Sequence, residues 1–111
     1  MSGAVQADER VLQEIVRRIV EAVHPDRIIL FGSRARGEAG PDSDYDILII
    51  APTDLPELDR TGPLYLRLRG LGITKDVLWH TPDEAEWWRD VRGHLITTAI
   101  REGKVIYERA A

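Results

Sequence analysis

Apolar residues recur at helical spacing near the start of the chain. They stand three and four positions apart between residues 11 and 23, which predicts an amphipathic helix with one face against a core. The members of this stripe are Val11, Leu12, Ile15, Val16, Ile19, Val20 and Val23. Asp8 is the expected N-cap, and Pro25 is expected to end the helix, because proline disfavours the α conformation in the residue before it.

Two short apolar runs then predict buried strands. The first covers residues 28–31 and leads directly into Gly32-Ser33 and an expected helical turn at residues 34–36. A loop rich in glycine, proline and aspartate follows at residues 37–43. The second strand is expected at residues 44–50, polar where it begins and apolar where it ends, so that its polar end lies beside the Gly-Ser turn.

The second half of the chain alternates expected helices and strands. They are a helix at residues 64–69 after Pro63, a strand at 74–79, a helix from 82 to about 90, a helix at 94–101 closed by Gly103, and an edge strand at 105–107. The helix at residue 82 has the clearest start, with Thr81 as N-cap, Pro82 at the first position and Glu84 three positions after the cap. This order of elements predicts a small α/β domain.

Several large side chains can be assigned from strand and helix geometry. Tyr45 on the second strand is expected to face the core, opposite to its two neighbours. Trp87 and Trp88 point about 100° apart on a helix, so at least one is expected in the core, and the other is a candidate interface anchor. His80 and His94 are expected to be ordinary surface or hydrogen-bonding residues rather than ligands.

Length and composition narrow the class of protein. The chain of 111 residues fits a single domain over residues 1–111, without room for a separate substrate domain, so a partner or another subunit is expected to hold whatever is modified. Hydrophobic residues make up 43% and charged residues 31%, which is typical of a soluble globular domain. The chain has no cysteine and its histidines are far apart, so any metal is expected to be held mainly by oxygen.

Charge and hydropathy argue against nucleic-acid and membrane partners. The formal net charge is −4, and no basic stripe is present, so stable binding to a nucleic-acid duplex is not expected. The longest apolar run, residues 47–51, is too short to span a bilayer, and the first residues lack the layout of a signal peptide. A cytoplasmic protein without membrane contact is expected.

Two aspartates at the start of the second strand carry the candidate chemistry. Asp44 and Asp46 are separated by one residue, so on a strand they point to the same face. Carboxylates that close repel each other and usually have a compensating cation, which with oxygen ligands is Mg²⁺, or Mn²⁺ as the alternative. Gly32 allows a close backbone approach and Ser33 offers a hydroxyl and an N–H, which together suit a phosphate. The pattern predicts attack on a phosphoryl group.

The full motif resembles a known signature. Residues 31–37 (FGSRARG), a short loop and residues 43–49 (SDYDILI) closely resemble the signature of the DNA polymerase β-like nucleotidyltransferase superfamily. The short length, with residues 81–84 and 102–107, resembles the minimal nucleotidyltransferases, which are antitoxin partners of HEPN-domain proteins. This resemblance covers nearly the whole chain. It implies a mixed β-sheet flanked by helices, Mg²⁺-dependent use of ATP, and transfer of AMP to a tyrosine hydroxyl of a HEPN toxin, an RNase that is thereby silenced, in a hetero-oligomer.

The resemblance also implies a role for each site residue. A third carboxylate is expected on a neighbouring strand, where Asp76 stands, to complete the metal site and help deprotonate the attacking hydroxyl. Arg34 and Arg36 match positions less tied to the chemistry; they are candidate phosphate or substrate contacts, against the alternative of surface pairs with Glu38 or Asp42. The expected metal ligands are Asp44, Asp46 and Asp76, and the expected nucleotide contacts are Gly32, Ser33, Arg34 and Arg36.

Two other functions stay open at this point. One is a non-catalytic antitoxin that only masks the toxin, and the other is the catalytic subunit of a small-molecule nucleotidyltransferase of the aminoglycoside-modifying type. P-loop chemistry is not expected, because no Gly-Lys-Ser/Thr follows the glycine, and a serine hydrolase is not expected, because Ser33 lacks the Gly-x-Ser-x-Gly elbow. Template-directed polymerisation is not expected either, since the chain is too short for DNA-binding subdomains.

Overall fold

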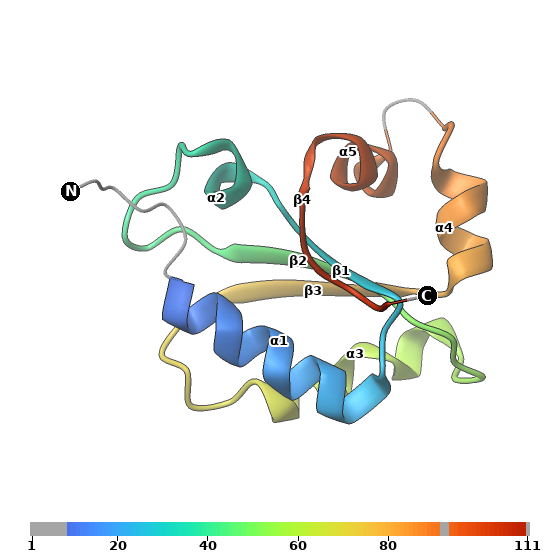
Figure 1. The fold of residues 1–111 in the computed structure, drawn as a ribbon, viewed down its shortest axis with the longest axis horizontal. Helices are drawn as coiled ribbons and strands as arrows, with labels where there is room; N and C mark the ends of the chain where they lie inside the picture. The colour runs from blue at the N-terminus through green and yellow to red at the C-terminus, as the bar shows by residue number, and fades with distance from the viewer. Residues whose placement is uncertain (1–8, 92–93, 111) are drawn as a thin grey trace.

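The computed structural model describes residues 9–91 and 94–110, which form a four-stranded sheet with helices on both faces (Figure 1). In chain order the elements are α1 (Glu9–Val23), β1 (Arg27–Phe31), α2 (Ser33–Arg36), β2 (Tyr45–Ile50), the 3₁₀ helix η1 (Glu57–Asp59), α3 (Thr61–Arg67), β3 (Lys75–His80), α4 (Pro82–Trp88), α5 (Leu95–Glu102) and β4 (Lys104–Glu108). Within these described residues, no helix combines the length and the apolar character needed to cross a bilayer.

The sheet is mixed, as the resemblance implied. Its strand order is β3-β2-β1-β4; β2 and β3 run parallel, while β1 is antiparallel to both β2 and β4. The register places Asp46 of β2 opposite Phe31 of β1 on one side and opposite Asp76 of β3 on the other. The topology therefore brings the end of β1 and the starts of β2 and β3 to one place.

Alternation of side chains along the strands creates two cores, one on each face of the sheet. Helices α1 and α3 cover one face, where Ile15 and Ile19 of α1 are fully buried against the strands. Helices α4 and α5 cover the other, where Ala85 and Ile96 are buried (Figure 1). Tyr45 belongs to the first core and is 3% exposed, which confirms its predicted orientation.

Most predicted element boundaries lie within a few residues of the structure. The first helix and the strands are confirmed, while the expected cap Asp8 lies outside the described residues. Helix α3 begins at Thr61, before Pro63, because the first turn of a helix tolerates proline. Helix α4 ends at Trp88 rather than at residue 90, and the 3₁₀ helix η1 was not predicted. The capping box of Thr81 and Glu84 is confirmed.

Gly103 closes α5 as predicted, but its backbone shows a different reason for glycine. Its φ is −78°, outside the left-handed region expected of a glycine cap. A Cβ at this position would lie 2.5 Å from the carbonyl oxygen of Ala99 and 2.5 Å from Cγ2 of Ile29. Glycine is therefore required by the close packing of the end of α5 on β1.

The outer edge of β3 is covered by the segment that precedes it. The backbone N–H of Val77 donates to the hydroxyl of Tyr65, at 3.0 Å, and Arg60 donates from Nη1 to the carbonyl of Trp79, at 3.3 Å. Arg60 is 6% exposed and also donates to both carboxylate oxygens of Glu84 in α4, at 2.7 and 3.1 Å. These contacts protect an otherwise open sheet edge and fix η1 and α3 against α4.

The two adjacent tryptophans of α4 have different environments. Trp87 is 67% exposed, whereas Trp88 is partly buried and packs against the core under α4 and α5. The ring of Trp88 stacks on that of His94, with 3.6 Å between the centroids. This confirms that at least one of the two belongs to the core and leaves Trp87 on the surface.

Candidate active site

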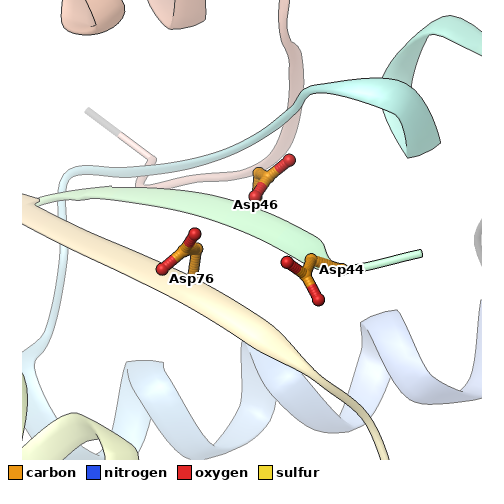
Figure 2. Close-up of side chains that lie close together, drawn as sticks. All are labelled: Asp44, Asp46 and Asp76. Carbon is orange, nitrogen blue, oxygen red and sulfur yellow. The ribbon is translucent and has the colours of Figure 1, made fainter. Parts of the chain in front are cut away.

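Three carboxylates meet at the beginning of β2 and β3. Asp44 directly precedes β2, Asp46 is the second residue of β2, and Asp76 is paired with Asp46 across the parallel β2–β3 ladder. Each offers one oxygen atom such that the three oxygens lie within 4.8 Å of one another (Figure 2). Asp44 and Asp76 are exposed and Asp46 is partly buried. The structure thus brings together the three aspartates that the sequence singled out.

The three carboxylates of this cluster carry like charges and lie close together. Among the described residues, no lysine or arginine forms an ion pair with Asp44, Asp46 or Asp76. The pKa of Asp46 is raised above its ordinary value, first by burial and then by the charges of Asp76 and Asp44, and Arg36 opposes this shift only in part. Three oxygen donors of like charge fit a hard divalent cation, which would relieve this repulsion.

The Gly-Ser turn lies directly against the cluster. Gly32 follows β1 with a φ of +76°, which favours glycine, and a Cβ built there would lie 2.1 Å from Oδ2 of Asp46. The N–H groups of Ala35 and Arg36 donate to the carbonyl of Gly32, which fixes the first turn of α2. Ser33 is the first residue of α2, where a backbone N–H has no acceptor inside the helix. A backbone N–H that can donate a hydrogen bond to a phosphate therefore lies next to the carboxylates.

Arg34 and Arg36 each form hydrogen bonds or ion pairs with other residues of the chain. Arg34 donates from Nε to the carbonyl of Ser43, at 2.9 Å, and from Nη2 to that of Pro41, at 3.2 Å. Its guanidinium carbon lies 4.0 Å from the ring centroid of Tyr45, so Arg34 holds the loop that leads into the aspartates. Arg36 pairs with Glu38 at 2.7 Å on the surface, which is the pairing weighed as the alternative to a phosphate contact.

Some residues near this site were not assigned a function from the sequence. His80 continues β3 on the face that carries Asp76, and it lines a pocket together with Trp88 and His94. The predicted strand at residues 74–79 ended one residue before His80; with the strand extended to His80, the alternation of side chains places it on the face of Asp76. The loop-holding contacts of Arg34, by contrast, depend on a turn geometry that has no local sequence signal.

The fold and the site together define a class of protein. A mixed sheet flanked by helices, with three aspartates on two adjacent strands beside a Gly-Ser turn, is the fold of the DNA polymerase β-like nucleotidyltransferases. The sequence profile described as Nucleotidyltransferase domain matches residues 10–106, so the chain belongs to this family.

A solved structure with the same fold agrees with this assignment. A protein from Sulfolobus solfataricus, described as a candidate nucleotidyltransferase, matches with a TM-score of 0.63 and 22% sequence identity, over 97% of this chain and 91% of that chain. At this identity the likeness shows the fold alone. No protein with a curated description matches the chain.

Proposed function

We propose that this protein is a nucleotidyltransferase that transfers AMP from ATP to a hydroxyl of a partner protein. The acceptor that the sequence resemblance favours is a tyrosine of a HEPN toxin, so that the modification makes the protein an antitoxin. The observation that carries the proposal is the complete cluster of Asp44, Asp46 and Asp76 against Gly32. A protein that only masks its partner has no use for three unbalanced carboxylates, which are unfavourable for folding.

Each carboxylate has a role in the proposed reaction. Asp44 and Asp46 would hold Mg²⁺, or Mn²⁺ as the alternative, with Asp76 completing the site. When bound, the ion screens the charge of the phosphates and helps to orient the attacking and leaving oxygens. Asp76, the exposed member on β3, is positioned to accept the proton of the acceptor hydroxyl. The acceptor oxygen forms a bond to the α-phosphorus of ATP, and the bond to the bridging oxygen breaks, which releases pyrophosphate.

The leaving phosphates are assigned to the Gly-Ser turn. Gly32 lets the backbone come close, and Ser33 contributes its hydroxyl and its N–H at the start of α2. Arg36 is an additional candidate, because its pair with Glu38 is exposed and such pairs are weak enough to exchange for a phosphate. For Arg34 a direct nucleotide contact requires release of the carbonyls of Pro41 and Ser43.

The partner is proposed from size and resemblance together. The described residues form one sheet with its helices and the loops that connect them, so the acceptor would be held by a second protein in a hetero-oligomer. The net charge of −4 supports a protein acceptor over a nucleic-acid duplex. Such a pair would act in the cytoplasm.

One incubation tests the proposal. The chain and a HEPN protein sought as the product of the neighbouring gene are mixed with Mg²⁺ and ATP, and both are weighed by intact-mass spectrometry, with an Asp44→Ala/Asp46→Ala variant as control. We expect one or more AMP groups on the HEPN protein only with the native chain. A stable complex without any mass gain would replace the proposal by a masking antitoxin. Transfer to an aminoglycoside in place of the protein would replace it by a small-molecule enzyme.

A further inference from the structure

A pocket of about 340 Å³ lies on the face of the sheet that carries the aspartates. It is bounded by β3, by α4 and by the start of α5, and η1 contributes Glu57. Its other principal lining residues are Leu78, His80, Glu84, Trp88, His94 and Leu95. No part of the proposed reaction uses these residues.

The register of β3 connects this pocket to the carboxylate cluster. Asp76, Leu78 and His80 alternate along the strand, so their side chains share one face. Two residues of a strand span about 7 Å, so the pocket begins about that far from Asp76. On the other side of the cluster lies Gly32, at the end of β1. Figure 1 shows α2 beyond the end of β1, away from α4, which follows β3.

This arrangement fixes the side from which an acceptor approaches. In phosphoryl transfer the attacking and leaving oxygens lie roughly in line on opposite sides of the phosphorus. With the leaving phosphates at Gly32 and Ser33, the acceptor must arrive from the β3 side, past Asp76. The pocket lies on the same face of β3, two residues along the strand from Asp76. The inference therefore rests on the proposed function and deepens it.

The chemistry of the pocket indicates what enters it. Leu78, Trp88 and Leu95 make it largely apolar, and its volume is at the lower end of ligand pockets, which suits one large side chain. Leu95 is 54% exposed, and Leu58, which follows the pocket residue Glu57 in η1, is 96% exposed. Exposed apolar side chains of this kind suit a protein partner better than a nucleobase.

The charged groups at the pocket are not equivalent. Glu84 is neutralised by Arg60, which donates to both of its carboxylate oxygens. Glu57 is exposed and, among the described residues, forms no ion pair within 4.0 Å, in a short helix that also carries Asp59. The entrance beside η1 is thus negative, which complements a basic residue on the partner.

We propose that this pocket receives a large apolar side chain of the acceptor protein, about two residues from the modified hydroxyl in an extended segment, with a basic residue of that segment facing Glu57. Two extended residues span about 7 Å, which equals the step from Asp76 to Leu78. The pocket is then a specificity site for the acceptor and takes no part in the chemistry.

The test compares two exposed leucines on opposite faces of the sheet. Leu95→Glu blocks the pocket, and Leu66→Glu in α3, where the leucine is 64% exposed, is the matched control. Transfer of AMP to the HEPN protein is measured against the concentration of each substrate. We expect Leu95→Glu to raise KM for the HEPN protein at least about tenfold and to leave KM for ATP within about twofold, with no change for Leu66→Glu.

A second variant and a binding assay keep the outcomes separate. Glu57→Lys, on the exposed helix η1, is expected to raise KM for the HEPN protein about threefold, whereas Glu86→Lys on the outer side of α4 is not. Equal values for Leu95→Glu and Leu66→Glu, or a raised KM for ATP alone, would overturn the inference. If the native chain transfers nothing, the proposed function fails, and calorimetric Kd values of the same variants for the HEPN protein still decide whether the pocket binds the partner.

Discussion

Two groups of charged side chains, the Arg60–Glu84 pair beside β3 and the aspartate cluster of β2 and β3, differ in how their charges are balanced. Glu84 accepts hydrogen bonds from Arg60, at 2.7 and 3.1 Å, and from the N–H of Thr81, at 2.9 Å, and these lower its pKa to about 2. Asp46 is partly buried and lies close to the charges of Asp76 and Asp44, and both effects raise its pKa. Glu84 has its counter-charge in Arg60, whereas no described residue between 9 and 91 or 94 and 110 forms an ion pair with Asp46.

The difference separates a structural site from a ligand site. The Arg60–Glu84 pair joins η1, β3 and α4 and has its hydrogen-bonding capacity used by neighbours, so it contributes to the fold. The aspartate cluster opposes folding while its charges are unbalanced, and it gains from any cation that binds there. Unbalanced charge in a folded protein is therefore the better marker of function. The predictions below test this contrast.

The largest effect is expected for loss of a carboxylate that faces the reacting atoms. Asp44→Asn and Asp76→Asn should each lower the rate of AMP transfer at least about 100-fold, since one removes a metal ligand and the other the proton acceptor. The rate is measured with saturating ATP and partner. Asp54→Asn, an exposed loop residue, is the control and should keep the native rate. Native rates in both cluster variants would exclude the proposed chemistry.

A second prediction separates backbone strain from displacement of Asp46. Gly32→Ala and Gly70→Ala both place alanine at a positive φ, of 76° and 84°, which costs about 1–2 kcal/mol of stability in each case. A Cβ added at Gly70 meets no other atom within 4 Å. A Cβ added at Gly32 lies 2.1 Å from Oδ2 of Asp46, so the Asp46 side chain must rotate away.

Only Gly32→Ala should therefore affect the site. We expect its affinity for Mn²⁺ to fall about 10–100-fold, measured by calorimetry, while Gly70→Ala binds as the native chain does. The free energies of unfolding of the two variants should agree within about 1 kcal/mol. Equal metal affinities would show that Asp46 is not a ligand or that it moves without consequence.

The sequence predicted those features that depend on local geometry. Alternation on a strand was sufficient to bring Asp44 and Asp46 to one face, and the hydrogen-bonding groups of Thr81 and Glu84 were sufficient to place the start of α4. Asp76 required more, because its pairing with Asp46 depends on a parallel ladder between strands 30 residues apart in the chain, which only the resemblance indicated.

Other features depend on tertiary contacts without a local signal. The sequence around Arg60 is a proline-containing loop, and nothing in it shows that this arginine is 6% exposed and bound to a glutamate 24 positions away. The same holds for Arg34, whose partners are carbonyl groups of a loop whose course depends on the packing of Tyr45. Backbone carbonyls are present at every residue, so no residue pattern marks them as acceptors.

Substitutions in the Arg60–Glu84 pair are expected to change the stability of the fold and not the transfer reaction. Glu84→Gln keeps a side chain that can complete the capping box but leaves the buried Arg60 without a counter-charge, which should lower the free energy of unfolding by about 2 kcal/mol at pH 7. Glu86→Gln, on the same helix, breaks only an exposed 3.4 Å pair with Arg89 and should cost less than about 0.5 kcal/mol.

The pH dependence of this difference has a definite sign. The pKa of Glu84 is lowered from 4.5 to about 2 in the folded protein, so its contribution is present above pH 4.5 and is lost as the pH falls towards 2. Urea unfolding of the native chain and Glu84→Gln at pH 7 and at pH 3 should show a smaller gap at the lower pH. A gap that grows on acidification would mean that Arg60 does not stabilise the ionised form of Glu84.

The smallest effect has the opposite direction and tests the ligand site. Asp46→Asn removes one of three repelling charges, so in a chelator at pH 7 it should raise the free energy of unfolding by about 1 kcal/mol. Because burial and like charges raise the pKa of Asp46, native stability is lost as the pH rises through that pKa, and the gain from asparagine should vanish below about pH 3, where aspartate is mostly protonated in both states. Millimolar Mg²⁺ should reverse the order at pH 7, because it stabilises the native cluster and binds the variant weakly. If Asp46→Asn is less stable than the native chain in chelator, Asp46 is a structural residue with a hydrogen-bonding role, and the contrast with Glu84 fails at its central residue.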